Sequence, residues 1–359
     1  MTNSELGWSQ PFDLHEYFRA EFPEKWTPAR VSASSHGEFQ LLSEQGTHLA
    51  SVSGRLRLDS KEGAAWPVVG DWVAAMPKEN APYVIQRVLP RTSTLYRGLA
   101  DRGEPDQIMV ANVDVAMVLT GLDNDFNTRR LERFLYLASS SGIRPVIVLN
   151  KADLHTDLEE VRAIVSKVAA GCAIHVISAQ TGLGVDELAR SIQPGQTAVL
   201  LGSSGVGKST LLNRFSGVEH QRTSAVRESD SKGRHTTTTR NLIPMPGGWV
   251  LIDMPGIRAV GLPGGHEAME AVFPDIDAWS MECKFADCTH QTEPECRLTE
   301  VLRSGELSPE RFANYRKMLL EVAFQQIQGD KQAELQKKAF TKVVHKAQKK
   351  MYRQRDEAD

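Results

Sequence analysis

Cysteine is scarce in this sequence. Four cysteines occur among 359 residues, and three of them lie between positions 283 and 296. So few thiols in so long a chain exclude a disulfide framework of the kind that stabilises small secreted proteins. Their clustering suggests a metal site instead.

Long apolar runs and a signal peptide are also missing. No apolar stretch approaches the roughly 20 residues that a membrane-spanning helix needs. The first ten residues, MTNSELGWSQ, have neither the basic nor the apolar region of a signal peptide. We therefore expect a cytoplasmic protein without membrane contact. With 41% apolar residues, the chain can form the cores of two or three globular domains.

A large excess of charge of one sign is absent as well, since the formal net charge is −3. This argues against nucleic-acid binding through bulk charge. The charge is nevertheless uneven, because the segment from Lys337 to Arg355 contains no acidic residue. Both a local basic surface for RNA and an ordinary solvated helix are consistent with that segment.

The hydrophobic pattern divides the chain into four parts. Residues 1–28 show no sustained period and form an N-terminal extension of unknown order. Residues 29–105 contain short alternating segments, RVSASS, FQLLSE, HLASVSGRLRL and DWVAAM, which predict a small antiparallel β-barrel or sandwich. The following LADRGEPDQIMVAN indicates a linker. Residues 106–262 alternate strands with helices, and residues 263–359 carry the cysteine cluster and charged helical sequence.

The third part has the pattern of a mainly parallel α/β sheet. Compact apolar runs end in polar loops in VDVAMVLTG, RPVIVLNKAD, AIHVISA, TAVLLGSSG and WVLIDMPG, and helical stretches lie between several of them. Such strands are buried on both faces by helices. Ligands bind at the carboxyl ends of the strands in such sheets, so we expect functional residues in the loops that follow them.

The segment GSSGVGKST follows one of these strands and matches the phosphate-loop pattern G-x-x-x-x-G-K-[ST]. Its glycines let backbone N–H groups turn toward phosphates, Lys208 can reach the β- and γ-oxygens, and Ser209 can ligate Mg²⁺. The predicted nucleotide-binding residues of this loop are Gly202, Ser203, Ser204, Gly205, Val206, Gly207, Lys208, Ser209 and Thr210.

Further motifs identify the nucleotide. In NKAD, the Asp153 carboxylate can accept two hydrogen bonds from the N1–H and 2-amino groups of guanine, whereas adenine offers no such pair of donors. This predicts GTP. The segment SAQ resembles the base-contacting loop of GTPases, and DMPG would place Asp253 near magnesium and the Gly256 amide near the γ-phosphate. The predicted residues of these motifs are Asn150, Lys151, Ala152, Asp153, Ser178, Ala179, Asp253 and Gly256.

The order of these motifs differs from that of ordinary GTPases, in which the phosphate loop comes first. Here NKAD and SAQ precede it. A circular permutation explains this order: the usual ends of the domain are joined through QPGQ, and new ends open after DMPG. Because domain termini often lie close together, such a rearrangement can preserve the sheet.

This combination resembles the ribosome small subunit-dependent GTPase A family, also called RsgA or YjeQ. The resemblance rests on VVGDWV in the barrel region, the permuted motif order, GRHTTT after the phosphate loop, and the cysteine-histidine cluster. It implies an oligonucleotide-binding (OB) barrel and a slow GTPase, forming GDP and phosphate, that the 30S ribosomal subunit stimulates and that serves late 30S maturation. It also implies contact with 16S rRNA and allows other 30S assembly factors as partners. We expect a monomer.

The segment GRHTTT occupies the place of switch I. One threonine there should ligate Mg²⁺ when GTP is bound, and we favour Thr237 over Thr236. Where many GTPases have a water-orienting Gln after their DxxG motif, this chain has Ile257, which cannot hydrogen-bond. His235 is the internal candidate for orienting the attacking water or accepting its proton, and an ordinary solvated histidine is the alternative. We predict catalytic roles for His235, Lys208 and Thr237.

The cysteine cluster has the spacing Cys-x4-Cys-x-His-x5-Cys, formed by Cys283, Cys288, His290 and Cys296. Three thiolates and one imidazole suit a closed tetrahedral Zn²⁺, which is structural because no coordination position is left for water. We predict one structural zinc ion per chain, in addition to the Mg²⁺ that accompanies GTP.

Barrels of this class often bind nucleic acid. We expect Phe39, Trp66 and Trp72 to be core residues rather than base-stacking residues. Arg55 and Arg57 alternate along the predicted strand SGRLRL, on a face that is either solvated or in contact with phosphate. A rival function is a GTP-dependent RNA-binding switch whose target is not the 30S subunit. Stimulation of GTP turnover by purified 30S subunits distinguishes the two functions.

Overall fold

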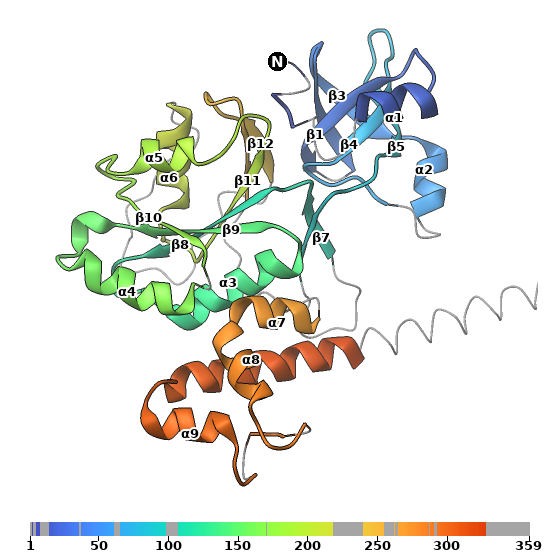
Figure 1. The fold of residues 1–359 in the computed structure, drawn as a ribbon. Helices are drawn as coiled ribbons and strands as arrows, with labels where there is room; N and C mark the ends of the chain where they lie inside the picture. The colour runs from blue at the N-terminus through green and yellow to red at the C-terminus, as the bar shows by residue number, and fades with distance from the viewer. Residues whose placement is uncertain are drawn as a thin grey trace, which may run out of the picture.

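The structure is a computed structural model of the chain. It describes residue 2 and residues 5–7, 14–35, 37–60, 65–97, 107–169, 171–217, 240–254, 262, 265–286, 288–290 and 293–327. A barrel, an α/β sheet and a helical part follow one another along the chain. They are drawn in Figure 1 in blue, in green to yellow, and in orange to red.

The first strands form a closed barrel. They are β1 (Thr27–Ser35), β2 (Glu38–Ser43), β3 (Gly46–Val52), β4 (Trp72–Met76) and β5 (Tyr83–Val88). Their order is β1-β2-β3-β5-β4, and the barrel closes because β4 also pairs with β1. The β3–β5 pairing is parallel, and the others are antiparallel. The interior is filled by alternating apolar residues such as Val31, Leu41 and Ile85. The predicted OB barrel is confirmed.

The predicted strand HLASVSGRLRL is wrong in its second half, which forms helix α2 (Gly54–Asp59). Ser53 caps this helix, since its hydroxyl accepts a hydrogen bond from the Leu56 N–H at 3.1 Å, and the Leu56 side chain is buried. A serine cap satisfies one of the free N–H groups at the start of a helix. Arg55 and Arg57 therefore lie on a helix and share no strand face. An alternation this short does not distinguish the repeat of a strand from that of a helix.

The barrel aromatics occupy different environments. Phe39 and Trp72 are both 2% exposed, as predicted for core residues. Trp66 is 38% exposed, so the prediction of a core position is wrong for this residue. The centre of its ring still lies 6.1 Å from that of Phe39, a residue of the barrel core.

The N-terminal residues pack against the outside of the barrel. Helix α1 (Leu14–Glu21) contributes Phe18, which is buried together with Leu6 and Phe22. These side chains share a cluster with Trp72, whose neighbour along β4, Val73, points into the barrel interior. The described part of the N-terminal extension is therefore a packed part of the fold.

A short hairpin-like pair follows the barrel. Strands β6 (Thr94–Arg97) and β7 (Gln107–Ala111) are antiparallel. Residues 99–112 are predicted as a linker, and this is wrong for β7, in which Met109 and Val110 are buried. The apolar run IMVA follows a charged, Gly- and Pro-containing segment, and a run this short gives no clear period.

The central sheet is built from β8 (Val115–Gly121), β9 (Arg144–Asn150), β10 (Ala173–Val176), β11 (Thr197–Leu201), β12 (Asn241–Pro244) and β13 (Val250–Asp253). Their order in space is β10-β9-β8-β11-β13-β12, and within this described sheet only β12 runs antiparallel to its neighbours. The sheet meets the barrel where Asn241 of β12 pairs with Ala33 of β1. The predicted mainly parallel sheet is confirmed.

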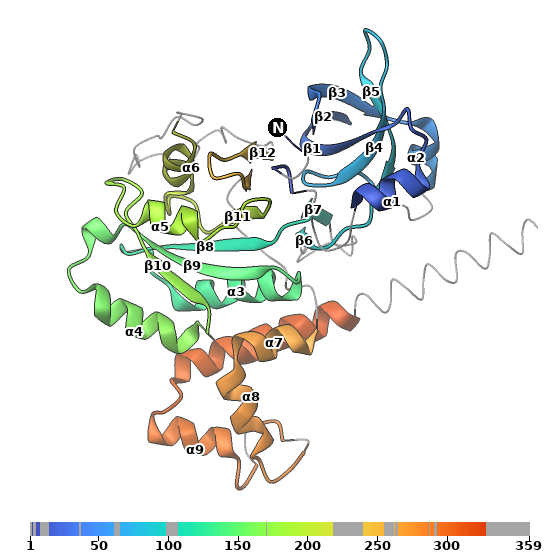
Figure 2. The same cartoon turned by 45° about the horizontal axis from the view of Figure 1, so that its top comes forward.

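Helices cover both faces of this sheet, as Figure 2 shows. They are α3 (Thr128–Ser140), α4 (Leu158–Val168), α5 (Val185–Arg190) and α6 (Lys208–Ser216). Successive residues of β8 alternate between the faces: Val115 and Met117 join the core under α5 and α6, whereas Ala116 and Val118 join the core under α3 and α4. The strands are therefore buried on both sides, as their continuous apolar sequence requires.

The helical part packs against α3, on the α3–α4 side of the sheet (Figures 1 and 2). Its elements are α7 (His266–Val272), α8 (Pro274–Met281), α9 (Arg297–Ser304) and a helix over residues 309–327. Phe273 and Met318 belong to the same buried core as Leu131 and Leu135 of α3. In the portion of the chain that the structure describes, no helix combines the length and the hydropathy that a membrane span needs.

Arg30 joins separate segments in the interior. It is 1% exposed and donates hydrogen bonds to the carbonyl oxygens of Leu6, Gly70 (3.1 Å) and Asn112 (2.9 Å). Its guanidinium carbon also lies 5.5 Å from the centre of the Trp72 ring. One cation therefore ties the N-terminal segment to the barrel and to the turn that leads into the central sheet.

The variant Arg30→Met tests this role. It should lower the free energy of unfolding by about 3 kcal/mol, because buried carbonyl groups lose a charged donor. Urea denaturation followed by tryptophan fluorescence measures the change. The matched control is Arg87→Met on the exposed face of β5, which should change stability by no more than about 0.5 kcal/mol. Equal midpoints for the two variants would contradict the prediction.

Candidate nucleotide-binding site and metal cluster

The phosphate loop connects the end of β11 to the first residue of α6, at the carboxyl edge of the sheet. Gly207 has a φ of 99°, and a side chain there would collide with the Asn150 amide. A Cβ atom on Gly202 would lie 2.8 Å from the carbonyl oxygen of Leu119 in β8. Glycine at these positions therefore lets the loop turn close against its neighbouring strands.

Lys208 is a half-buried cation in this loop. Its Nζ donates hydrogen bonds to the carbonyl oxygens of Gly202 (2.9 Å) and Ser203 (2.5 Å). Burial lowers the pKa of Lys208 to about 8, although the negative charge of Asp253 raises it. The desolvated ammonium group is held by neutral carbonyls, and a phosphate oxygen would be a stronger, charge-assisted partner.

Asn150 joins the phosphate loop to the loops that follow β9 and β10. It is the last residue of β9 and is 2% exposed. Its Nδ2 donates a hydrogen bond to the carbonyl oxygen of Val206 at 2.8 Å, and its Oδ1 accepts one from the Ala179 N–H at 2.9 Å. One side-chain amide therefore fixes the spacing of the NKAD, SAQ and phosphate loops.

The residues next to Asn150 form the side of the site that is predicted to hold guanine. Lys151 has a φ of 67°, which turns the chain into a short 3-10 turn at Ala152–Leu154. Asp153 is exposed in this turn, with its carboxylate available to a ligand. Ser178 is fully buried, and its hydroxyl accepts a hydrogen bond from the Thr181 N–H at 3.1 Å.

The remaining strand end contributes Asp253. It is the last residue of β13, which runs parallel to β11, so its carboxylate comes to the same edge of the sheet as the phosphate loop. It is 6% exposed. Ser209 and Thr210 follow Lys208 in the first turn of α6.

The described part of the chain thus brings the predicted nucleotide-binding residues to one edge of the sheet. Other predicted residues lie outside the residues that the structure describes. They are His235, Thr236, Thr237, Gly256 and Ile257.

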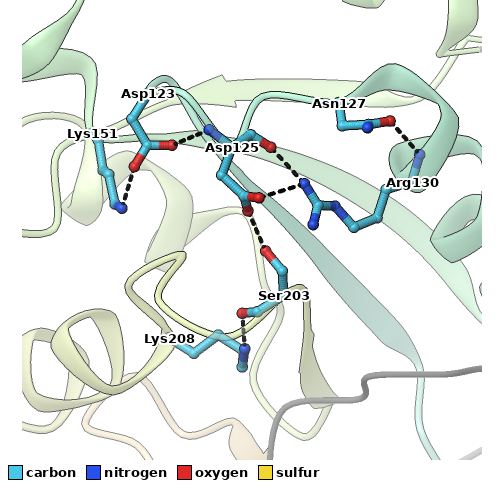
Figure 3. Close-up of polar contacts among 7 residues, drawn as sticks. All are labelled: Asp123, Asp125, Asn127, Arg130, Lys151, Ser203 and Lys208. Carbon is cyan, nitrogen blue, oxygen red and sulfur yellow. Dashed lines mark hydrogen bonds and ion pairs between the residues drawn. The ribbon is translucent and has the colours of Figure 1, made fainter. Parts of the chain in front are cut away.

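The loop after β8, residues 122–127, also reaches this edge, although no motif in the sequence predicts it. Asp123 Oδ2 forms an ion pair with Lys151 Nζ at 2.6 Å, and Asp125 Oδ2 accepts a hydrogen bond from Ser203 Oγ at 2.7 Å. Both contacts are drawn in Figure 3. A signal was present, because this loop also follows a buried strand at the carboxyl edge of the sheet. The loop matches no nucleotide-binding motif, and its partners lie far away in sequence.

The predicted metal ligands converge between α8 and α9. His290 Nδ1 lies 3.6 Å from Cys283 Sγ and 3.5 Å from Cys296 Sγ, and these two sulfurs are 3.9 Å apart. With Cys288, all ligand atoms lie within 4.8 Å of one another. Around a tetrahedral ion with bonds of about 2.3 Å to sulfur and 2.0 Å to nitrogen, ligand atoms are about 3.5–3.8 Å apart. The cluster therefore has the composition and spacing to hold a metal ion.

A mainly parallel sheet with a phosphate loop, and with the base-recognition motifs ahead of that loop in the chain, defines a circularly permuted P-loop GTPase. The RsgA GTPase family model matches residues 88–263. Curated relatives match nearly the whole chain at about 40% identity. The protein belongs to the RsgA GTPase family.

Individual relatives support this assignment. The small ribosomal subunit biogenesis GTPase RsgA of Syntrophotalea carbinolica is 39% identical over 363 residues, which cover 99% of both chains. The protein of the same name from Opitutus terrae is 41% identical over 90% of both chains. The crystal structure of YjeQ from Thermotoga maritima superimposes with a TM-score of 0.61 at 28% identity, over 83% of this chain and 99% of that one. YloQ, whose structure is described as a circularly permuted GTPase, shares the fold with a TM-score of 0.58 at 24% identity, over 85% and 98% of the two chains.

The variant Asn150→Ala tests the amide that links the loops. It should weaken GDP binding by about a hundredfold, because the Val206 carbonyl and the Ala179 N–H lose a buried partner and the loops lose their spacing. Titration with a fluorescent GDP analogue measures Kd, and thermal unfolding checks that the variant is folded. The control Asn124→Ala, at an exposed position in the loop after β8, should bind like the parent protein. Equal Kd values for both variants would refute the linking role.

Proposed function

We propose that this protein is a GTP-hydrolysing factor that acts on the small ribosomal subunit during its late maturation. The observation that carries the proposal is the meeting of the phosphate, NKAD and SAQ loops around the Asn150 amide, at the carboxyl edge of a permuted sheet. Support for the target comes from relatives named small ribosomal subunit biogenesis GTPases, which match up to 99% of the chain.

In this proposal GTP lies along the carboxyl edge. The backbone N–H groups of the phosphate loop, from Gly202 to Thr210, and the Lys208 ammonium group bind the phosphates. Asp153 accepts the paired hydrogen bonds of guanine, and the loop of Ser178 and Ala179 lines the base. Ser209, Asp253 and Thr237 are the residues that would hold Mg²⁺, which neutralises charge on the phosphates during hydrolysis.

Hydrolysis is assigned to a group outside the phosphate loop. Ile257 stands where many GTPases have glutamine, so the attacking water lacks that partner. We assign the orientation of this water to His235, in the switch I position, and the contact with the γ-phosphate to Lys208 and the Gly256 N–H. Intrinsic turnover is then slow, and it rises when the ribosomal subunit orders the segment that carries His235.

The Cys3His cluster is proposed to hold one structural Zn²⁺. Cys283, Cys288, His290 and Cys296 supply a full tetrahedral set, so no position remains for a catalytic water. The cluster sits in the loop between α8 and α9, which contains little other regular structure among its described residues. The ion would therefore fix the shape of a loop that cannot bury an apolar core of its own.

The accessory parts, residues 29–105 and 263–359, are proposed to contact the ribosomal subunit and its 16S rRNA from either side of the GTPase domain, residues 106–262. The OB barrel belongs to a class that binds nucleic acid through one face and its loops. A monomer in the cytoplasm, meeting other 30S assembly factors on the same particle, fits this role.

GTP turnover with purified ribosomal particles tests the function. We expect 30S subunits to raise the rate at least about tenfold and 50S subunits to leave it unchanged, because only the proper target orders the catalytic segment. His235→Ala should lower the stimulated rate by about a hundredfold, in the range of general acid–base catalysis, without changing the Kd for GTP. His220→Ala, a second histidine between the phosphate loop and β12, is the matched control.

Two outcomes would count against this proposal. Turnover that 30S subunits do not raise, together with binding to another RNA, would favour an RNA-binding switch with a different target. If 30S subunits still stimulate GTP turnover by His235→Ala, the 30S subunit remains the target, but another group orients the attacking water.

Zinc content tests the metal assignment. The purified chain should contain about one zinc ion, and Cys288→Ala should contain less than half of that, because three remaining ligands leave the tetrahedron open. Cys172→Ala removes the cysteine outside the cluster and should retain the metal. Inductively coupled plasma mass spectrometry of protein purified without chelators gives the ratio. Equal zinc in the two variants would refute the ligand set.

A further inference from the structure

The loop after β8, residues 122–127, lies between two parts of the nucleotide site. Strand β8 is flanked by β9 on one side and by β11 on the other, and both pairings are parallel. The loops that follow these strands therefore leave the same edge of the sheet side by side. The loop after β8 contacts both the NKAD loop and the phosphate loop, and we call it the clamp loop.

Asp123 connects the clamp loop to the NKAD side. Its Oδ2 pairs with Lys151 Nζ at 2.6 Å, and its Oδ1 accepts a hydrogen bond from the Asp125 N–H at 3.1 Å. Burial raises the pKa of Asp123, but the hydrogen bond from Lys151 and that N–H outweigh it, so the pKa is lowered overall. The carboxylate is therefore charged at neutral pH and holds the lysine that follows Asn150.

Asp125 connects the clamp loop to the phosphate side. Its Oδ2 accepts a hydrogen bond from Ser203 Oγ at 2.7 Å, and its Oδ1 forms an ion pair with Arg130 at 2.7 Å. The same arginine donates a hydrogen bond to the Asp125 carbonyl oxygen at 2.6 Å. Arg130 itself is fixed on α3, whose first turn is capped by the Asn127 side chain at 3.1 Å. Figure 3 shows these contacts together.

The contact between Asp125 and Ser203 is linked to Lys208, the lysine of the phosphate loop. The carbonyl oxygen of Ser203 accepts a hydrogen bond from Lys208 Nζ at 2.5 Å. A chain of polar contacts therefore runs from Arg130 through Asp125 and Ser203 to Lys208, as drawn in Figure 3. The Asp125 carboxylate thus holds the Ser203 side chain, and the Ser203 carbonyl oxygen holds the Lys208 ammonium group.

Charge balance explains why two carboxylates are tolerated beside a site for phosphates. Asp123 is paired with Lys151 and Asp125 with Arg130, so the clamp loop and its partners carry no net charge. The Lys208 ammonium group remains for the ligand. An Asp125 carboxylate without Arg130 would repel the phosphates, and would repel GTP more than GDP because GTP carries more negative charge.

We propose that Asp125 is a positioning residue for nucleotide binding: through Ser203 it holds the phosphate loop in its binding shape, and Arg130 neutralises its charge. Asp123 does the same for the base-binding loop through Lys151. This inference rests on the proposed binding of GTP to the same site. It assigns a nucleotide-binding role to a loop that contains no known GTPase motif.

A double-mutant cycle on nucleotide affinity tests the contact between Asp125 and Ser203. Asp125→Ala and Ser203→Ala should each weaken GDP binding about tenfold, the effect of one charge-assisted hydrogen bond. The double variant should also be weaker by about tenfold and not by about a hundredfold, because both changes remove the same contact. In steady-state turnover KM should rise while kcat stays within about twofold, since the loop shape serves the ground state and the transition state equally.

A charge-rescue experiment tests the role of Arg130. Arg130→Gln should weaken GTP binding more than GDP binding, because it leaves the Asp125 carboxylate unpaired. Adding Asp125→Asn should restore the GTP affinity to within about threefold of the parent, since asparagine keeps an acceptor for Ser203 without the charge. Arg129→Gln, the exposed neighbour on α3, is the matched control and should leave both affinities unchanged.

The outcomes separate this inference from the proposed function. A parent protein that does not bind GDP would overturn the proposed function itself. If the parent binds GDP but the Asp125 and Ser203 effects add to about a hundredfold, the two residues act independently and the positioning role fails. It also fails if Asp125→Ala lowers the melting temperature without changing Kd, or if the Asp125→Asn change does not rescue Arg130→Gln.

Discussion

The side-chain amide of Asn150 is the contact on which the nucleotide-binding edge depends. It donates to the Val206 carbonyl and accepts from the Ala179 N–H, so both of its polar ends are used in an almost fully buried position. This is possible because β9 and β11 flank β8 in a parallel sheet, which brings their following loops to one edge. The position of the amide also requires glycine at residue 207, because the amide occupies the space that a Cβ atom of Gly207 would need. Contacts within the protein therefore set the spacing of the loops.

Helix α3 connects this edge to the part of the chain that carries the Cys3His cluster. Its start holds the clamp loop through Arg130, and its next turn faces the helical part, where Glu132 accepts a hydrogen bond from Asn314 at 2.5 Å. Burial raises the pKa of Glu132 to about 7, although the nearby Arg311 charge lowers it. A buried carboxyl group of this kind makes the packing between α3 and residues 309–327 specific, because it requires its partner. The permuted chain order leads from the end of β13 into the same helical part, so this part is attached to the GTPase domain both along the chain and through the α3 interface.

Much of the fold followed from local patterns. The buried strands β8, β9 and β11 are continuous apolar runs, and α3 is one of the helical stretches expected between the strands. The errors occurred where patterns are short. The alternation in SGRLRL resembles a strand, but the Ser53 cap starts a helix there, and the run IMVA was too short to reveal β7. Trp66 was expected in the core because it is large and aromatic, yet the barrel interior was already filled by smaller alternating residues.

The sequence by itself determined the chemical components of this protein. A phosphate loop, an NKAD motif and a Cys3His spacing are each encoded within a few consecutive residues, because each depends on local backbone geometry or on the number and type of ligands. Only the tertiary structure decided how distant residues are paired. Asp123 contacts Lys151, and Asp125 contacts Ser203, because β8 lies between β9 and β11. Arg30 contacts the carbonyl oxygens of Leu6, Gly70 and Asn112 because the N-terminal segment folds back over the barrel. Such pairings depend on strand order and packing, which no short stretch of sequence records.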